Sequence, residues 1–127
     1  MRVSKIRRDE RGASAVEFAM TAPVFFAVLF GIIDGGLLLW TQLGLQHGAE
    51  MAARCAGIYK STTNCGNTSI QTYAAQQAYG LNPPPSTFTV STTACGTRVS
   101  ASYTFNFITS YFEMPSLAIS AQACFPS

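Results

Sequence analysis

The chain has 127 residues and a formal net charge of +2, with 48% hydrophobic and only 11% charged residues. Five basic and two acidic residues lie within positions 1–12, and positions 13–127 hold three basic and four acidic residues. The body of the protein is therefore almost neutral, which excludes a nucleic-acid-binding domain, because such a domain needs a basic face. It is also too apolar and too weakly charged to be a disordered chain. A single histidine argues against a zinc enzyme of the usual kind.

A membrane-spanning helix is predicted directly after the basic residues. Residues 18–33 form a run of 16 without a charge, and apolar residues continue past Asp34 to Leu45. At about 1.5 Å per residue, residues 18–45 would reach roughly 42 Å, more than the hydrocarbon core of about 30 Å. Because positive charges precede the run, the N-terminus is expected in the cytoplasm, and Trp40 at the opposite membrane interface.

The helix is expected to continue beyond the membrane with one apolar face. Polar residues alternate with Leu, Met and Ala after Thr41, and the pattern predicts one helix from Ala13 to about Tyr59. Pro23 is expected to bend this helix, since a proline in mid-helix removes a hydrogen bond and crowds the preceding turn. Asp34 leaves two alternatives. It either makes a buried polar contact between packed helices, or is already in water because the span ends near Ile33.

The remaining residues predict a small α+β head. Turn residues over 61–67 precede a short helix over 70–79, with Thr68 and Gln71 as a capping box and Gly80 as its stop. Alternation of apolar and polar residues then predicts three antiparallel strands, over 88–93, 99–107 and 117–123. The apolar face of such a sheet needs a partner, for which the amphipathic half of the long helix is available.

The predicted fold class is thus α+β, with a long N-terminal membrane-spanning helix packed on a three-stranded antiparallel sheet and a short second helix. The expected domains are a basic leader (1–12), a transmembrane and assembly helix (13–45), and a periplasmic or extracellular head (46–127).

Four cysteines beyond a membrane span are typical of an oxidising compartment and a disulfide-supported head: Cys55, Cys65, Cys95 and Cys124. Cys55 and Cys65 lie ten residues apart across the loop after the long helix, so a bridge between them is easy to close. Cys95 and Cys124 lie at the same end of the sheet, but a middle strand between them would separate their Cα atoms by about 10 Å, too far for a bridge. Of three possible connectivities, 55–65 with 95–124 is favoured, provided that the strand ends curl past the middle strand or the strand order differs.

No catalytic, cofactor or metal site is predicted. His47 and Cys55 lie eight residues apart on one helix, roughly 12 Å along its axis, which is too far for proton transfer. The cysteines form no Cys-x-x-Cys pair. We therefore expect no enzyme activity, no cofactor, and neither nucleic acid nor a small-molecule substrate as a partner.

The N-terminal segment resembles the processing site of type IV prepilins. It has a basic leader, then Gly12, then a helix with Glu17 five residues after the expected cut. The pair Glu17-Phe18, Pro23, and the stretch Gly31-Ile32-Ile33-Asp34 are similar to the TadE-like family of tight-adherence (Tad) pilus proteins. The resemblance covers roughly residues 8–40, and the later strands agree with that family in layout.

This resemblance implies a pilin-like minor pilin or pseudopilin of a Tad-type pilus or secretion system. An inner-membrane prepilin peptidase would cut between Gly12 and Ala13. Other Tad pilins and the inner-membrane assembly platform would be the further partners. The protein would sit as a single-pass protein in the bacterial inner membrane with a periplasmic head, or be incorporated in an extracellular pilus. The assembly residues would be Glu17, Phe18, Pro23 and Asp34.

Glu17 has a physical reason to need a partner, because a carboxylate one turn inside an apolar helix is costly in lipid. After cleavage, the free amine of Ala13, its own or a neighbour's, is available as that partner. The alternative is that Glu17 simply stays among the lipid headgroups. The alternative for the whole protein is an unprocessed bitopic anchor whose periplasmic head acts as a binding or scaffold domain.

Overall fold

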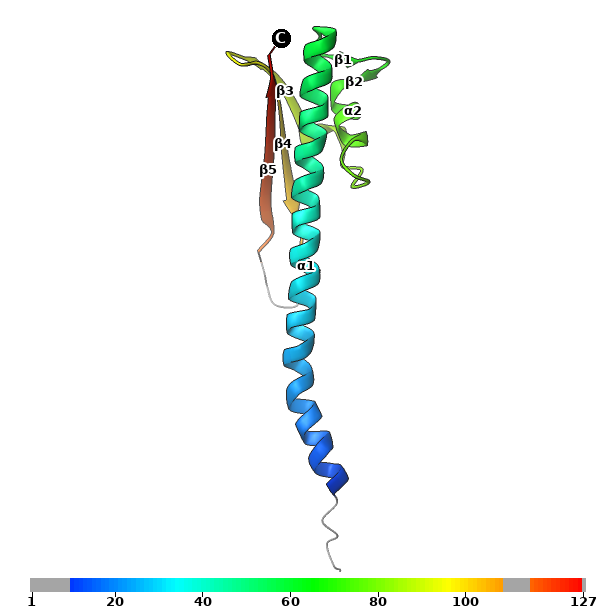
Figure 1. Cartoon of the computed structure of the whole chain (residues 1–127), viewed down its shortest axis with the longest axis vertical. Coiled ribbons are helices and arrows are strands. Elements are labelled where there is room, and N and C mark those ends of the chain that lie inside the picture. The colour runs from blue at the N-terminus through cyan, green and yellow to red at the C-terminus, as the bar shows by residue number, and fades with distance from the viewer. Residues whose placement is uncertain (1–9, 109–114, 127) are drawn as a thin grey trace, which may run out of the picture. The chain divides into compact units, whose positions relative to one another are not determined.

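The computed structural model describes residues 10–108 and 115–126 (Figure 1). Its contacts divide the chain into two compact units, Met1–Ile33 and Asp34–Ser127, and the long helix contributes to both. The predicted α+β fold, with one long helix, a three-stranded antiparallel sheet and a short second helix, is confirmed. The elements in chain order are α1 (Glu10–Tyr59), β1 (Asn64–Cys65), β2 (Thr68–Ser69), α2 (Ile70–Gln76), the 3-10 turn η1 (Pro85–Thr87), β3 (Phe88–Thr93), β4 (Gly96–Phe105) and β5 (Leu117–Phe125).

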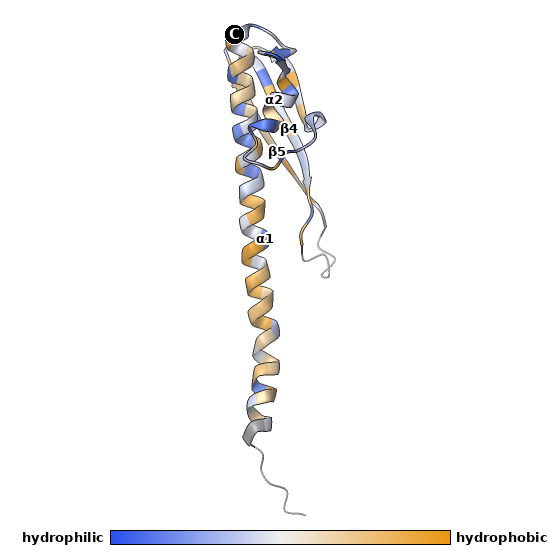
Figure 2. Cartoon of the chain, turned by 90° about the vertical axis from the view of Figure 1, so that its right-hand side faces the viewer, coloured by the Kyte–Doolittle hydropathy of each residue, from blue (hydrophilic) through white to orange (hydrophobic). Residues whose placement is uncertain are grey.

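The first unit is the N-terminal part of α1, and its described side chains lie almost entirely outside any core. The helix runs without interruption through Pro23. Figure 2, which colours the ribbon by residue hydropathy, shows mostly apolar residues in this part and a mixture further along. Among the described residues, α1 is the one helix long and apolar enough to cross a membrane, by length and composition.

The second unit places the three-stranded sheet and α2 on the other part of α1. The strand order is β3-β4-β5, with both pairs antiparallel, and Ala101 of β4 stands opposite Phe88 on one side and Ala121 on the other. Alternate residues of β4 point into the core, as the period-2 pattern predicts. The core joins residues of all these elements: Leu45, Ala49, Ala52, Ala53 and Ala56 of α1, Ile70, Ala74 and Ala75 of α2, and Phe88, Val99, Ala101, Phe105, Ile119 and Ala121 of the strands.

Both cysteine bridges that the sequence analysis favours are present, between Cys55 and Cys65 and between Cys95 and Cys124. The middle strand does separate β3 from β5, yet the Cα atoms of Cys95 and Cys124 are only 6.4 Å apart. Cys95 lies in the turn between Thr93 and Gly96, before β4 begins, so it can reach past the end of the middle strand. The strand order therefore does not prevent the bridge.

Several boundaries differ from the sequence-based ones. The N-cap of α2 is Ser69, not Thr68, because the Ser69 hydroxyl accepts a hydrogen bond from the Thr72 N–H at 3.2 Å. Gln71 does not complete a capping box; its amide donates to the carbonyl oxygen of Phe88 at 2.9 Å. The helix ends at Gln76, three residues before the predicted end.

Two further segments differ between the sequence-based prediction and the structure. The turn predicted over 61–67 contains β1, which pairs with β2 as two short antiparallel strands, with Gly66 between them at φ +67. The middle strand of the large sheet runs from Gly96 to Phe105, so it starts three residues earlier and ends two residues earlier than predicted. Its first residues pair with the hairpin partner β3 across a tight turn, a constraint that residue alternation alone does not reveal.

The approach of α2 to α1 depends on a glycine. A Cβ atom placed on Gly48 would lie 2.6 Å from the carbonyl oxygen of Ala74, which belongs to the α2 backbone. A rotamer change cannot relieve that overlap, because the atom that it meets is backbone. We therefore expect Gly48→Ala to lower the free energy of unfolding by about 1–3 kcal/mol, the usual range for overpacking, measured by near-UV circular dichroism in detergent micelles.

Gly36→Ala is the matched control on the same helix, since a Cβ atom there meets nothing within 4 Å. Alanine is the better helix former by about 1 kcal/mol, so this variant should unfold no earlier than the wild type. Equal losses in both variants would contradict the close helix approach.

Candidate functional site

The predicted cleavage site lies in the first turns of α1. Gly12 and Ala13 are both helical and exposed, and Glu17, one turn further along, is exposed as well. The first four N–H groups of any helix have no partner within the helix, so unwinding at this end breaks few hydrogen bonds. Residues 13 and 17 are four apart and therefore lie on the same helix face.

A continuous exposed apolar surface follows Glu17. Phe18 is 70% exposed, and large apolar side chains remain exposed along the rest of the first unit: Met20, Val24, Phe25, Phe26, Val28, Leu29, Phe30, Ile32 and Ile33. Such a surface is far larger than soluble monomers tolerate, so lipid or other helices must cover it. Pro23 lies within this surface, and the nearby Thr21 hydroxyl donates to the carbonyl oxygen of Glu17 at 3.0 Å. A bend at Pro23 stays a prediction.

Of the two alternatives for Asp34, the structure favours the buried polar contact, and contact with a neighbouring helix stays a prediction. Its side chain is buried, with 5% of its surface exposed, so it is not in water. Its Oδ1 accepts a hydrogen bond from the backbone N–H of Ile108 at 3.1 Å, three residues after the end of β4. One partner of Asp34 is thus the backbone of the same chain. Asp34 ties the end of the sheet to α1 at the start of the second unit.

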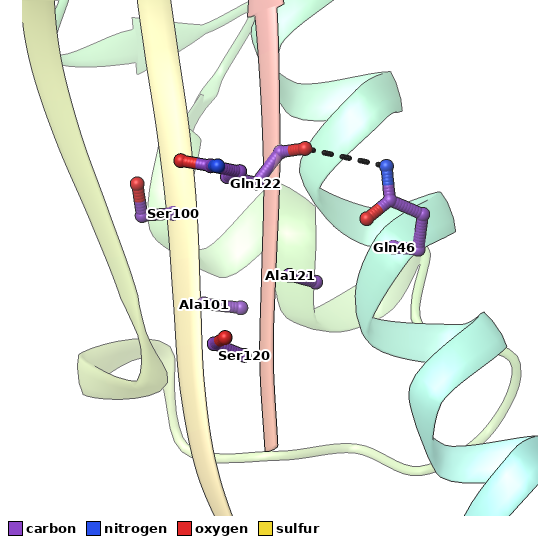
Figure 3. A pocket seen from close by; sticks show the side chains of 6 residues that line it. All are labelled: Gln46, Ser100, Ala101, Ser120, Ala121 and Gln122. Carbon is purple, nitrogen blue, oxygen red and sulfur yellow. Dashed lines mark hydrogen bonds between the residues drawn. The ribbon is translucent and has the colours of Figure 1, made fainter.

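Two glutamines of α1 have a structural role that their sequence pattern does not reveal. The amide of Gln42 donates to the carbonyl oxygen of Ser120 at 3.0 Å, and that of Gln46 to Gln122 at 3.3 Å. Figure 3 shows Gln46 reaching from the helix to β5, which is an edge strand of the sheet. An uncovered strand edge invites pairing with other chains, so these contacts protect it. The two glutamines are four residues apart and therefore share one helix face, but this spacing is equally typical of a face exposed to water.

His47 and Cys55, the two residues weighed above as an acid–base and thiol pair, have separate partners in the structure. The ring of His47 stacks on that of Tyr79, with centroids 4.4 Å apart, and Cys55 is bridged to Cys65. The pocket beside Gln46 is lined by small and amide side chains without a titratable group: Ser100, Ala101, Ser120, Ala121 and Gln122. Across residues 10–108 and 115–126, no group of three or more His, Cys, Asp or Glu side chains is arranged to hold a metal ion.

The contact between Asp34 and Ile108 makes a testable prediction. Asp34→Ala removes the acceptor from a backbone N–H, which typically costs about 1–3 kcal/mol when the group is buried. We expect faster hydrogen exchange in a peptide that contains Ile108, measured by mass spectrometry on the full chain in micelles.

Asp34→Asn is the control, because its side-chain oxygen can still accept this hydrogen bond. Its exchange at Ile108 should stay close to that of the wild type. A peptide covering β3 should be unchanged in both variants, and unchanged exchange at Ile108 in the alanine variant would argue against the contact.

Comparison with known families places the resemblance on this helix. The family model described as TadE-like protein matches residues 12–54, a range within α1 that includes the exposed apolar surface, Asp34, Gln42 and Gln46. A search of curated proteins and a search of solved structures gave no match to the chain. The match points to a component of a Tad pilus with an apolar N-terminal helix. The resemblance of this chain to the TadE-like family is thereby confirmed, over residues 12–54.

Proposed function

We propose that the protein is a minor pilin or pseudopilin of a Tad-type pilus or secretion system. In this proposal α1 anchors it in the bacterial inner membrane, with the N-terminus in the cytoplasm and the second unit in the periplasm. The observation that carries the proposal is the exposed apolar surface of α1 between Val16 and Ile33, with Glu17 near its start. The TadE-like match over the same helix supports it.

This surface suits a helix that exchanges one apolar environment for another. Lipid covers it before assembly, and the helices of other Tad pilins cover it within the filament. Because lipid is as apolar as a leucine side chain, burying this surface between helices gives little driving force and little control over axial position. A polar contact must therefore set the register of neighbouring subunits.

Glu17 is the residue that we assign to that contact. Cleavage between Gly12 and Ala13 by a prepilin peptidase would create a charged amine on Ala13, four residues before Glu17. The amine and the carboxylate would then lie on one face, one turn apart, within a chain or between neighbours. Phe18 and the other exposed apolar residues would pack around this pair, with the assembly platform of the inner membrane bringing subunits together.

Processing can be tested directly on the protein recovered from its native membrane. We expect an intact mass that corresponds to a chain beginning at Ala13, with or without an added methyl group. Gly12→Leu should remain unprocessed, since a bulky side chain then occupies the residue before the cut.

Gly36→Leu is the matched control, because it introduces the same side chain into α1 far from Gly12 and should be processed normally. A wild-type chain that still carries residues 1–12 would contradict processing and favour the alternative, an unprocessed bitopic anchor with a periplasmic binding or scaffold head.

The proposed role of Glu17 predicts a selective assembly defect. Glu17→Gln removes the negative charge, which would leave the amine of Ala13 unpaired among apolar helices at a cost of about 3–5 kcal/mol. We expect at least about a tenfold loss from the sheared surface-filament fraction, since each tenfold corresponds to about 1.4 kcal/mol. Cleavage and membrane insertion should be retained.

Glu50→Gln is the control, because Glu50 is an exposed carboxylate of the same helix within the second unit. It should assemble as the wild type does. Normal recovery of the Glu17 variant in the filament fraction would mean that Glu17 stays among the lipid headgroups.

A further inference from the structure

The length of the uncharged run bears on where the membrane ends. Residues 18–33 form a helix of 16 residues, which at about 1.5 Å per residue is roughly 24 Å long. A hydrocarbon core of about 30 Å needs about 20 residues, so a span that starts at Phe18 reaches Leu37. Asp34 then lies about one helical turn inside the hydrocarbon boundary, where an uncovered carboxylate is costly.

The second unit covers Asp34, and in doing so it brings its own backbone to that depth. Ile108 donates its backbone N–H to Asp34, which fixes residue 108 at the level of residue 34 on α1. The Ile108 side chain is nevertheless 62% exposed. Backbone outside a helix is tolerated at such depth only where protein covers it, and here Asp34 accepts the hydrogen bond of the Ile108 N–H.

Aromatic side chains gather about one to two turns further along α1. Trp40 is 55% exposed, and its ring centroid lies 6.0 Å from that of Tyr79, which follows α2 and is 51% exposed. Tyr79 has a φ of +46, a region that bulky residues rarely adopt, and it is stacked on His47. The contacts of Tyr79 with Trp40 and His47 thus hold it in a backbone conformation that costs free energy. Tryptophan and tyrosine are the residues that favour the headgroup layer, where one end is apolar and the other is wet.

We propose that Ile108, Trp40 and Tyr79, together with the exposed Leu39 and Leu43, form a membrane-contact surface of the second unit. This surface inserts at the boundary between acyl chains and headgroups, with Ile108 deepest. The second unit then rests on the bilayer and is not held away from it by a free stalk. Lipid is favoured as the occupant because the surface continues an apolar helix of membrane-spanning length and combines aliphatic with amphipathic aromatic side chains. The inference rests on the proposed membrane insertion of α1.

The chain has a single tryptophan, which allows the depth of chosen positions to be measured one at a time. The full-length protein is reconstituted into phosphatidylcholine vesicles whose lipid is brominated either near the headgroup end or near the end of the acyl chains. Two variants lack the native tryptophan (Trp40→Phe) and carry a new one, introduced by either Ile108→Trp or Tyr79→Trp. The wild-type protein reports on the third site, Trp40. Iodide, which stays in water, is the quencher for exposed tryptophan.

Two further variants in the same background mark the extremes. Phe26→Trp reports on the predicted centre of the span, and Tyr59→Trp on the exposed far end of α1. We expect Trp40 and the tryptophans at 108 and 79 to emit at shorter wavelength than the one at 59. They should lose most intensity to lipid brominated near the headgroups. The tryptophan at 26 should respond most to bromine near the chain ends, and that at 59 to iodide alone.

The outcomes separate this inference from the membrane insertion on which it depends. Deep quenching at 26, with positions 108 and 79 responding only to iodide as 59 does, would leave α1 in the membrane and overturn the contact surface. The exposed side chains would then be available to another protein, such as a neighbouring pilin helix. No quenching by brominated lipid at position 26 would overturn both the insertion and the contact surface.

Discussion

The close packing of the second unit depends on small side chains along one face of α1. Gly48 lets the backbone of Ala74 approach, and alanines at 49, 52, 53 and 56 form the part of the core on which the sheet lies. With larger residues there, helix and sheet would stand further apart, and the glutamines at 42 and 46 would no longer reach the edge strand β5. Because α1 lies close to the sheet, its glutamines can reach β5 and protect that edge from pairing with other chains. Before Asp34, α1 is exposed and apolar, whereas from Gly48 onward one of its faces carries small side chains that pack in the core.

The two carboxylates of the apolar segment differ in what surrounds them. Asp34 is buried and accepts a hydrogen bond from the backbone of Ile108, so its own chain provides a polar contact for it. Glu17 is exposed on the surface of the first unit. The sequence resemblance grouped both residues as assembly residues. Their environments support different roles, with Asp34 holding the sheet to the helix and Glu17 available to another group.

Local sequence patterns predict the helices and strands well, but they predict the exact helix ends and the contacts between distant residues poorly. Alternation located β3 and most of β4 and β5, and the apolar run located α1, because burial on one face or in lipid leaves a periodic or continuous signal. The N-cap at Ser69 was assigned one residue early, since Thr68 and Ser69 are both good capping residues and only backbone geometry chooses between them. The contact between Asp34 and Ile108 joins positions 74 residues apart, for which a single sequence carries no local signal. The stacking of Tyr79 on His47 was missed for the same reason.

The arrangement has a consequence for how a subunit would leave the membrane. If Ile108, Trp40 and Tyr79 contact lipid, extraction of α1 into a filament must also strip these side chains from the interface, and each apolar side chain transferred from lipid to water costs about 1.5–3 kcal/mol. Neighbouring subunits can offset that cost only if their surfaces cover the same residues. A filament contact over Leu39, Trp40 and Leu43 would do so, because these residues continue along α1 from the apolar surface that is proposed to pack in the filament. The surface that is proposed to rest on lipid before assembly is thus the one that neighbouring subunits would have to cover afterwards.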